Sequence, residues 1–242
     1  TVAGSGGQSR AVRWTLAGGL ESLGVPGLHS IAHAASADGT VVVGQGPYQD
    51  PQHSGAFLWT AGVGNTFLPV PGTSSTQAQG VSGHGNVVVG TANGRGFRWS
   101  DVSGTTLLPA LDPPTGSSGA YAVSADGSVI VGRCSATVGD DACRWIGGGV
   151  ESLGTLPGRS QATAYATNAD GSVVVGRSNS PQQDEGFRWE GGQMVGLGTL
   201  PGYTASRALG VSADGSVVVG YCTGGSNPSS AAFVWTPWLG MR

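Results

Sequence analysis

The sequence has little charge and no lysine. All 11 of its basic residues are arginine, charged residues make up only 10% of the chain, and the formal net charge is −3 at pH 7. A nucleic-acid-binding surface needs a basic face, so this balance argues against a nucleic-acid partner. A disordered chain would carry more charge and fewer valines and tryptophans, so the composition favours a folded, turn-rich, all-β protein.

Long apolar runs are also missing. No uninterrupted apolar stretch approaches the roughly 20 residues that a transmembrane helix needs, which argues against membrane insertion of this domain. We expect no signal peptide within the chain, because its first residues already belong to a repeat. We therefore expect any export signal to have been removed or to lie upstream.

The sequence also lacks recognisable catalytic motifs. The nucleophile motif G-x-S-x-G does not occur, and Ser-Ala-Asp-Gly resembles the sialidase Asp-box only superficially, since glycine follows aspartate directly. The four histidines fall in different repeats or elements: His29, His33, His53 and His84. His29 and His33 are four residues apart, but on a loop and a strand this spacing does not bring two ligands to one metal as it would on a helix.

Two pairs of neighbouring acids, Asp140–Asp141 and Asp184–Glu185, occupy equivalent loops in adjacent repeats. Paired carboxylates can serve acid–base catalysis or hold Ca²⁺, but adjacent acids in loops are far more often simply solvated. We interpret both pairs as solvated and expect no catalytic residue, no metal site and no cofactor.

What the sequence has in abundance is a repeat. The stretch Ala120–Gly132, AYAVSADGSVIVG, predicts a strand of small residues, a tight turn at Asp-Gly and a valine-rich strand. Close copies of it occur at Ala32–Gly44, Ala78–Gly90, Ala164–Gly176 and Ala208–Gly220. Each is followed by a strand that contains tryptophan, such as GFRWS at Gly96–Ser100, and then by a leucine-rich segment.

The period of this repeat predicts the architecture. The valine-rich strands begin at residues 41, 87, 129, 173 and 217, so the period is 42–46 residues. Four strands in a repeat of this length are typical of a β-propeller blade. The short turns join antiparallel neighbours, so the order across a blade is small-residue strand, valine strand, tryptophan strand and leucine strand.

We predict one β-propeller domain over residues 1–242, with six blades of four antiparallel strands. The first blade lacks its inner strand. The repeats cover approximately 1–25, 26–70, 71–110, 111–156, 157–200 and 201–242. The alternative is a longer array of which this chain is a fragment.

The tryptophan strands predict contacts between repeats. In the pattern Phe-x-Trp, phenylalanine and tryptophan share one side of the strand and are expected to pack between neighbouring blades. The residue between them is arginine in each repeat that is followed by a turn with aspartate, and it is Leu58 in the repeat that is followed by a turn with His84 instead. This predicts four ion pairs between blades: Arg13–Asp38, Arg98–Asp126, Arg144–Asp170 and Arg188–Asp214.

The motifs (A/G)-F-R-W, LGTLPG and VSADGSVVVG resemble the HAF repeat of bacterial extracellular proteins and autotransporter passengers. The resemblance covers nearly the whole chain. It departs at the histidine of His-Ala-Phe, where this chain has Gly55 or Ala231. The resemblance implies export to the cell surface or the medium, and it implies no established chemistry.

Candidate binding residues lie at two kinds of position. The variable position of the inner strand, A-x-(A/G), recurs in one register and predicts a ring near a central channel: His33, Gln79, Tyr121, Tyr165 and Leu209. Loops of variable length share one face of the predicted ring and contribute further candidates: Tyr48, His53, Arg159, Tyr203 and Arg207. Variable loops on a rigid scaffold commonly carry binding sites, and aromatic faces beside amides suit sugar rings. The alternative is that the inner-strand side chains only pack the centre.

Two of the three cysteines are expected to form a disulfide, and the third is expected to be free. Cys134 and Cys143 flank one loop between two antiparallel strands, so we predict a disulfide between them, which an exported protein tolerates. Cys222 has the register of Cys134, but Phe233 stands where its partner would be, so we predict a free thiol.

The sequence therefore favours a secreted or cell-surface bacterial β-propeller that binds a glycan, as a lectin does, or adheres to a surface protein, without catalysis. A polysaccharide-acting enzyme and a purely structural spacer are the alternatives.

Overall fold

The computed structural model describes residues 2–5, 10–25, 29–48, 50–112, 116–180, 183–226 and 228–242. All regular structure in these ranges is β-strand, in 23 strands, so the all-β prediction is confirmed. No helix in the described ranges has the length and apolarity to cross a membrane.

The chain divides into two compact units. The first contains Thr1–Leu108 and Gly119–Gly127, and the second contains Pro109–Ser118 and Ser128–Arg242. Each unit is described by itself below, and the single domain over 1–242 stays a prediction.

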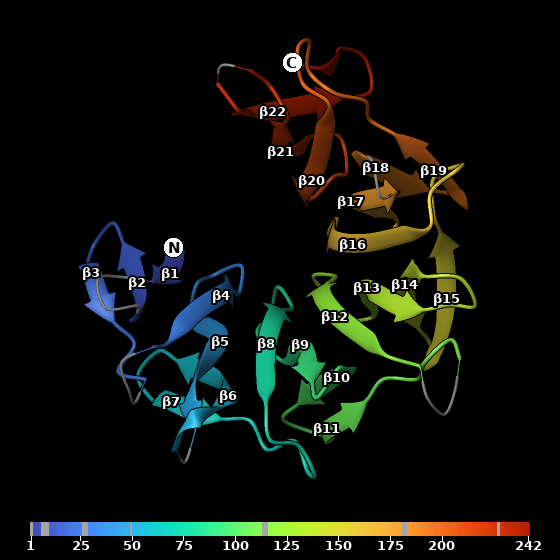
Figure 1. Ribbon diagram of the computed structural model, residues 1–242. Coiled ribbons are helices and arrows are strands. Elements are labelled where there is room, and N and C mark those ends of the chain that lie inside the picture. The colour runs from blue at the N-terminus through green and yellow to red at the C-terminus, as the bar shows by residue number, and fades with distance from the viewer. Residues whose placement is uncertain are drawn as a thin grey trace. The chain divides into compact units, whose positions relative to one another are not determined.

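The first unit holds three antiparallel sheets and one further strand (Figure 1). The first sheet is β1 (Val2–Ser5), β2 (Ala11–Thr15) and β3 (Gly19–Ser22). The second is β4 (Ile31–Ala35), β5 (Val41–Tyr48), β6 (Asp50–Thr60) and β7 (Gly64–Phe67). The third is β8 (Thr76–Val81), β9 (Val87–Ala92), β10 (Arg95–Ser100) and β11 (Gly104–Leu107), and β12 (Ser118–Val123) follows.

The second unit repeats this pattern. Its strands are β13 (Val129–Ser135), β14 (Asp140–Ile146), β15 (Gly149–Gly154), β16 (Gln161–Thr167), β17 (Val173–Ser180), β18 (Gln183–Glu190), β19 (Gln193–Gly196), β20 (Ala205–Val211), β21 (Val218–Thr223), β22 (Ser230–Thr236) and β23 (Gly240–Met241). One parallel pairing, Asp140 with Gln161, links β14 to β16, and all other pairings within the unit are antiparallel.

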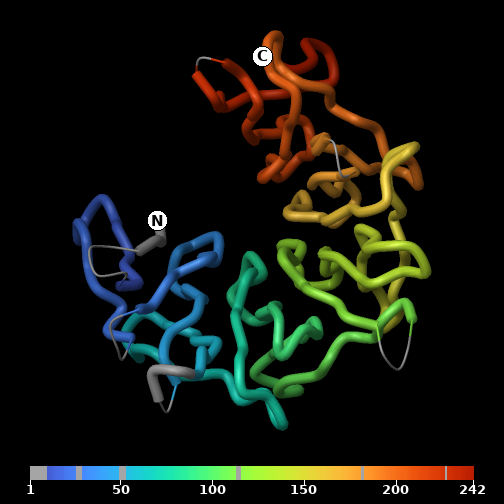
Figure 2. Tube along the Cα trace, viewed as in Figure 1, coloured from blue at the N-terminus to red at the C-terminus, as the bar shows by residue number. Residues whose placement is uncertain are grey.

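The predicted order of strands within a repeat is confirmed. The small-residue strand pairs with the valine strand, the valine strand with the tryptophan strand, and the tryptophan strand with the leucine strand, as in β4-β5-β6-β7 and β20-β21-β22-β23. Figure 2 shows the chain running back and forth through each of these sheets. The first sheet has three described strands, in the order β1-β2-β3.

The inner strands carry a feature that the periodicity does not predict. In β4, β8, β16 and β20 the register shifts by one residue, which makes a β-bulge at His33, Gln79, Tyr165 and Leu209. These are the variable positions that the sequence places in a ring. A bulge leaves the extra residue outside the regular pairing and re-aims its side chain.

The bulge explains the glycine that ends each Val-Val-Val run. A Cβ atom on Gly90 would lie 1.9 Å from the carbonyl oxygen of Gln77, and one on Gly176 would lie 2.0 Å from that of Thr163. Neither glycine has a positive φ. It is therefore the close approach of the bulged strand that requires glycine here.

Apolar side chains pack between consecutive sheets. Phe97 on β10 is fully buried and packs with Val41, Val43 and Leu68 of the preceding sheet. In the second unit, Phe233 packs in the same way with Val173 and other residues of the preceding repeat. The predicted position of phenylalanine between repeats is confirmed, and burial of such rings is the main favourable contribution to folding.

The predicted arginine–aspartate pairs are wrong for Arg13, Arg144 and Arg188. Each of these arginines pairs with a glutamate of its own repeat: Arg13 with Glu21 at 2.7 Å, Arg144 with Glu151 at 2.7 Å and Arg188 with Glu190 at 2.7 Å. Each guanidinium also lies over the tryptophan of the next repeat: over Trp59 at 4.5 Å, Trp189 at 4.5 Å and Trp235 at 5.9 Å. Arg98, of the fourth expected pair, has Ser103 as its hydrogen-bond partner at 3.5 Å.

The turn aspartates act locally instead. Asp38 accepts hydrogen bonds from the Thr40 amide at 3.0 Å and the Ser36 hydroxyl at 2.7 Å, and Asp214 does the same with Ser216 and Ser212. These hydrogen bonds lower the pKa of each carboxyl from 3.8 to about 2. The largest cause is the hydrogen bond from the Thr40 amide for Asp38 and the one from the Ser212 hydroxyl for Asp214. Aspartate is therefore selected here because it closes its own turn.

These turns predict a dependence of stability on acid. Because the folded pKa of both carboxyls lies below its unfolded value, their contribution is present above pH ~4 and is lost as the pH falls toward ~2. The free energy of unfolding, measured by urea denaturation from pH 7 to pH 2, should fall over that window. The Asp38→Asn/Asp214→Asn variant should lose less stability over the same window, and an identical loss would contradict this role.

Candidate functional site

Two of the predicted ring residues meet in one pocket of the first unit. This pocket has a volume of about 270 Å³ and lies beside β8, β9 and the residue Tyr121 of β12. We call it the Tyr121 pocket. Its lining residues are Ser75, Gln77, Gln79, Thr91, Asn93, Gly94 and Tyr121. The structure thus brings together Gln79 and Tyr121, which the sequence places in separate repeats.

The pocket is shaped by a tight hairpin. Asn93 (φ 45°) and Gly94 (φ 78°) form the two-residue connection between β9 and β10, and the Asn-Gly dipeptide is the strongest sequence signal for such a turn. The Asn93 side-chain oxygen accepts hydrogen bonds from the Ser75 amide at 3.1 Å and from the Ser74 hydroxyl at 3.4 Å. The Asn93 amide donates to the Ser75 carbonyl at 3.1 Å. Asn93 therefore holds the segment that leads into β8.

Two glutamine amides stand next to each other in the pocket. Gln79 Nε2 donates to Gln77 Oε1 at 3.1 Å. This pairing leaves Gln79 Oε1 as an acceptor and Gln77 Nε2 as a donor, since each amide group carries both functions. Gln79 reaches this position from the bulge of β8.

The aromatic ring of the pocket lies over a glycine. A Cβ atom on Gly119 would be 2.9 Å from the Tyr121 hydroxyl and 3.4 Å from that of Thr91. Tyr121 is half-buried. None of the residues that line the pocket carries a formal charge. The arrangement can therefore bind an uncharged ligand by contact with an aromatic side chain and hydrogen bonds to amides.

His33 and Tyr165 are not among the lining residues of this pocket. His33 is the bulged residue of β4, where partial burial lowers the pKa of its imidazole below 6.5 and a hydrogen bond with Gln45 opposes that shift. Tyr165 is the half-buried, bulged residue of β16 in the second unit. Their place in a common ring with Gln79 and Tyr121 stays a prediction.

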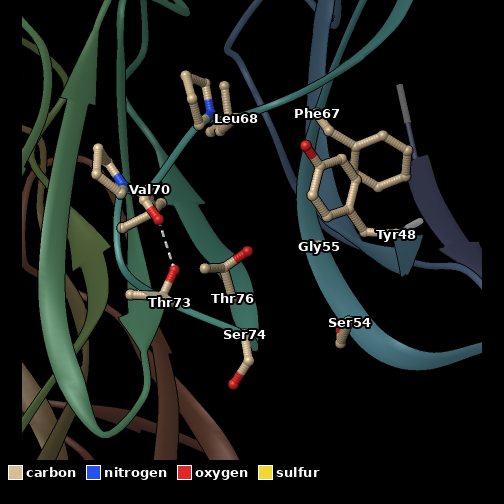
Figure 3. Close-up of a pocket in the computed structure, with 11 residues that line it drawn as sticks. Tyr48, Ser54, Gly55, Phe67, Leu68, Val70, Thr73, Ser74 and Thr76 are labelled. Atoms are coloured by element: carbon tan, nitrogen blue, oxygen red, sulfur yellow. Dashed lines mark hydrogen bonds between the residues drawn. The ribbon is translucent and has the colours of Figure 1, made fainter. Parts of the chain in front are cut away.

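A second pocket in the first unit, which we call the Tyr48 pocket, has a volume of about 260 Å³ (Figure 3). Tyr48 is 40% exposed and its ring lies against Phe67, with ring centroids 4.9 Å apart at an angle of 49°. The remaining lining residues are Ser54, Gly55, Leu68, Pro69, Val70, Pro71, Thr73, Ser74 and Thr76. His53, expected in a loop that extends the site of the inner-strand residues, lies instead on β6 with an exposed side chain.

Arg159 and Arg207 belong to an ion-pair network in the second unit. Arg159 pairs with Glu185 at 2.8 Å, and Asp184 pairs with Arg207 at 2.5 Å and with Arg177 at 3.1 Å. Arg207 also donates to the Tyr221 hydroxyl at 3.1 Å. The interpretation of Asp184 and Glu185 as merely solvated acids is therefore wrong, because arginines from β17, from β20 and from the segment before β16 pair with them.

The other acid pair and Tyr203 have structural partners too. Asp140 pairs with Arg133 at 2.7 Å, and Asp141 accepts a hydrogen bond from Ser152 at 2.5 Å, so these acids are not merely solvated either. Tyr203, a predicted binding residue, packs against the apolar cluster around Val175 and Phe233.

The expected disulfide joins Cys134 and Cys143, with a Cα–Cα distance of 6.0 Å. Cys222 is free and buried, as expected, and its sulfur accepts a hydrogen bond from the Leu200 amide at 3.4 Å.

Sequence reasoning missed several residues of the two pockets. Gln77, Thr91 and Asn93 line the Tyr121 pocket, and Phe67 supports Tyr48. The Asn-Gly dipeptide at 93–94 was a usable signal for the hairpin. The signal that could have found them is the register of β8 against β9, which pairs Ala78 with Gly90 and Gln77 with Thr91 and so brings Asn93 beside Ser75.

Comparison with known proteins supports the fold. No protein-family model and no curated protein matches the sequence. Among solved structures, the chain is similar to TolB from Acinetobacter baumannii (13% identity, TM-score 0.59), covering 94% of this chain and 57% of that one. It is similar to a putative TolB from Agrobacterium tumefaciens (13% identity, TM-score 0.62, 92% and 83% coverage).

Two further structures extend the likeness. One is the β-propeller domain of the Trilobed protease from Pyrococcus furiosus (10% identity, TM-score 0.50, covering 96% of this chain and 88% of that one). The other is an oligogalacturonate lyase in complex with manganese (14% identity, TM-score 0.61, 87% and 63% coverage). At these identities the likeness shows the fold alone: the chain is an all-β protein with the fold of β-propellers.

Proposed function

We propose that this chain is a non-enzymatic binding module that takes a neutral sugar in the Tyr121 pocket. The observation that carries the proposal is the convergence of Tyr121 with Gln77, Gln79 and Asn93 in one uncharged pocket. A sugar ring offers C–H faces that pack on an aromatic side chain and hydroxyls that both donate to and accept from amides. The pocket is small beside the roughly 300–1,000 Å³ of drug-sized sites, so it suits a single sugar ring.

The proposal includes the finer architecture and the location. We place the six repeats in one six-bladed propeller whose first blade lacks its inner strand, because the period of 42–46 residues recurs along the chain. We place the protein outside the cytoplasm, at the cell surface or in the medium. The Cys134–Cys143 disulfide supports this location, since disulfides persist in oxidising compartments.

A glycan array probed with the purified, folded chain tests the function. We expect hits among neutral glycans, and binding that changes little between low and high salt, because the pocket has no charge to screen. Tyr121→Ala should weaken binding at least tenfold. Trp238→Ala removes an aromatic side chain that is 68% exposed outside the pocket and should bind as the wild type does.

The outcomes separate the alternatives. Reproducible absence of hits with folded protein would overturn the glycan proposal and favour a surface protein as partner, or a spacer role. Mass analysis of a bound glycan after long incubation should show it intact. Cleavage would identify the polysaccharide-acting enzyme instead, a possibility raised by the likeness to the lyase, although the described residues contain no group of three or more histidines, cysteines or acids placed to hold a metal.

A further inference from the structure

We infer that the Tyr48 pocket is a second subsite for the same glycan, so that the ligand is an oligosaccharide that crosses residues 74 and 75 between the two pockets. This inference rests on the proposed function of the Tyr121 pocket. It specifies that the ligand is an oligosaccharide and not a single sugar, and it assigns Tyr48 a role in binding it.

Alternate residues of one segment, from Ser74 into the start of β8, line the two pockets. Ser74 and Thr76 line the Tyr48 pocket, whereas Ser75 and Gln77 line the Tyr121 pocket. Successive side chains of a strand point to opposite faces, so Thr76 and Gln77 at the start of β8 line different pockets, and Ser74 and Ser75 continue the alternation before the strand. A ligand that fills both pockets has to cross only this segment.

Asn93 holds the dividing segment in place. It lines the Tyr121 pocket, and its side-chain oxygen accepts hydrogen bonds from the Ser75 amide and the Ser74 hydroxyl, which faces the other pocket. The segment is thus tied to the β9–β10 hairpin by a side chain as well as by the backbone bond from the Asn93 amide to the Ser75 carbonyl. A held segment keeps a constant spacing between the two pockets, which favours a ligand of defined repeat.

The Tyr48 pocket has the chemistry of a sugar subsite. It offers the partly exposed ring of Tyr48, the hydroxyl of Ser54 and no charged lining residue (Figure 3). The Ser74 hydroxyl donates to Asn93 at 3.4 Å and can still accept a hydrogen bond from a ligand. Thr73 and Thr76 already serve the fold, because the Thr73 hydroxyl donates to the Val70 carbonyl at 2.7 Å and the Thr76 hydroxyl accepts from the Ala56 amide at 2.7 Å. An aromatic ring with adjacent hydroxyls matches the alternating apolar and polar surfaces of a sugar.

Gly55 makes room for the two aromatic side chains of this pocket. A Cβ atom on Gly55 would lie 2.6 Å from Tyr48 Cβ and 2.7 Å from Phe67 Cδ1, so only glycine lets Tyr48 lie against Phe67. At the same position, four residues before the tryptophan, later repeats carry Arg95, Asp141, Glu185 and Ala231, all with a Cβ atom. The packing of Tyr48 against Phe67 over a glycine is therefore particular to this repeat among those five, which favours a ligand site over a feature of the repeat itself.

Binding of sugar fragments of increasing length tests the inference. The probes are fragments of one, two and four sugar units prepared from the neutral glycan that binds most strongly on the array, measured by isothermal titration calorimetry. The wild type should bind the four-unit fragment at least tenfold more tightly than the single sugar. Tyr48→Ala should abolish this gain and leave the affinity for the single sugar within twofold of wild type, whereas Tyr48→Phe should retain the gain.

The controls separate failure of the inference from failure of the proposed function. Val63→Ala, at a side chain 80% exposed on the turn between β6 and β7, should bind all fragments as the wild type does. Thermal melting of each variant checks that it is folded. No length-dependent gain in the wild type, or an equal gain in folded Tyr48→Ala, would overturn the second subsite while the sugar site at Tyr121 stands. No binding of any fragment would overturn both.

Discussion

Replacing Gly90 by alanine is expected to lower the free energy of unfolding by roughly 3 kcal/mol or more, the upper end of what overpacking costs. The added Cβ would lie 1.9 Å from the Gln77 carbonyl oxygen and 2.9 Å from the Phe97 ring. The first contact is with backbone, so no side-chain rotation relieves it. Relief requires the bulged strand β8 to move away from β9.

The same loss is expected at Gly44, Gly176 and Gly220, where a Cβ would meet the carbonyl oxygens of Ile31, Thr163 and Arg207 at 1.9–2.0 Å. Urea denaturation followed by tryptophan fluorescence measures it. The matched control is Gly149→Ala, because Gly149 has no positive φ and its Cβ would come no closer than 3.8 Å to its nearest neighbour. A loss below about 1 kcal/mol in Gly90→Ala would show that the bulge is not held as described.

Removing the disulfide with Cys134→Ala/Cys143→Ala is expected to cost about 2–3 kcal/mol, since the bridge closes a short loop in the unfolded chain. The surroundings of the bridge suggest why it stands in this repeat. At other junctions a buried hydroxyl accepts a hydrogen bond from the amide three residues before the tryptophan of the preceding tryptophan strand: Ser30 from Ala11 at 2.9 Å, Thr76 from Ala56 at 2.7 Å and Ser206 from Gly186 at 2.9 Å.

The junction after the bridged repeat lacks that hydroxyl. At this junction Ala162 occupies the position of the hydroxyl residue, and Ala142 occupies the position of the residue whose amide would donate to it. Both alanines are fully buried. The disulfide between β13 and β14 thus stabilises the repeat whose link to the next has no such hydrogen bond.

Alkylation of the unfolded protein with iodoacetamide, followed by mass analysis, checks the pairing before stability is compared. One label is expected without reductant, on Cys222, and three are expected after reduction. Three labels without reductant would contradict the bridge. If the bridge is present but the double variant is as stable as the wild type, the stabilising role is wrong.

The repeated sequence was enough to predict the order of strands, because a turn such as Ala-Asp-Gly-Ser can join only antiparallel neighbours. It was also enough to place Phe97 and its equivalents between sheets, since side chains alternate along a strand. The bulges at His33 and Gln79 could not be predicted from the alternation, because A-x-A has the same pattern whether or not the middle residue is paired.

The partners of charged residues were harder to predict than the fold. Arginines such as Arg13 recur in the repeats that are followed by a turn aspartate such as Asp38, but the two residues do not pair. Asp38 accepts a hydrogen bond from Thr40 of its own turn, and Arg13 pairs with Glu21 across a hairpin. Only some of the residues that line the Tyr121 pocket were predicted from the sequence. The recurring position of the inner strand identified Gln79 and Tyr121. Gln77 and Asn93 were missed because they lie outside that position; the pairing of β8 with β9 places Gln77 opposite Thr91 and brings Asn93 beside Ser75.

Tyrosine-selective labelling tests the central claim, a sugar site at Tyr121, most directly. The chain has five tyrosines, so ¹³C labelling of their rings gives a spectrum simple enough to assign with Tyr121→Phe and the four equivalent variants. Titration with the neutral glycan found on the array should shift the Tyr121 ring signals and leave those of Tyr165, Tyr203 and Tyr221 in place. Shifts confined to Tyr165, Tyr203 or Tyr221, or no shift at a saturating glycan concentration, would contradict the account.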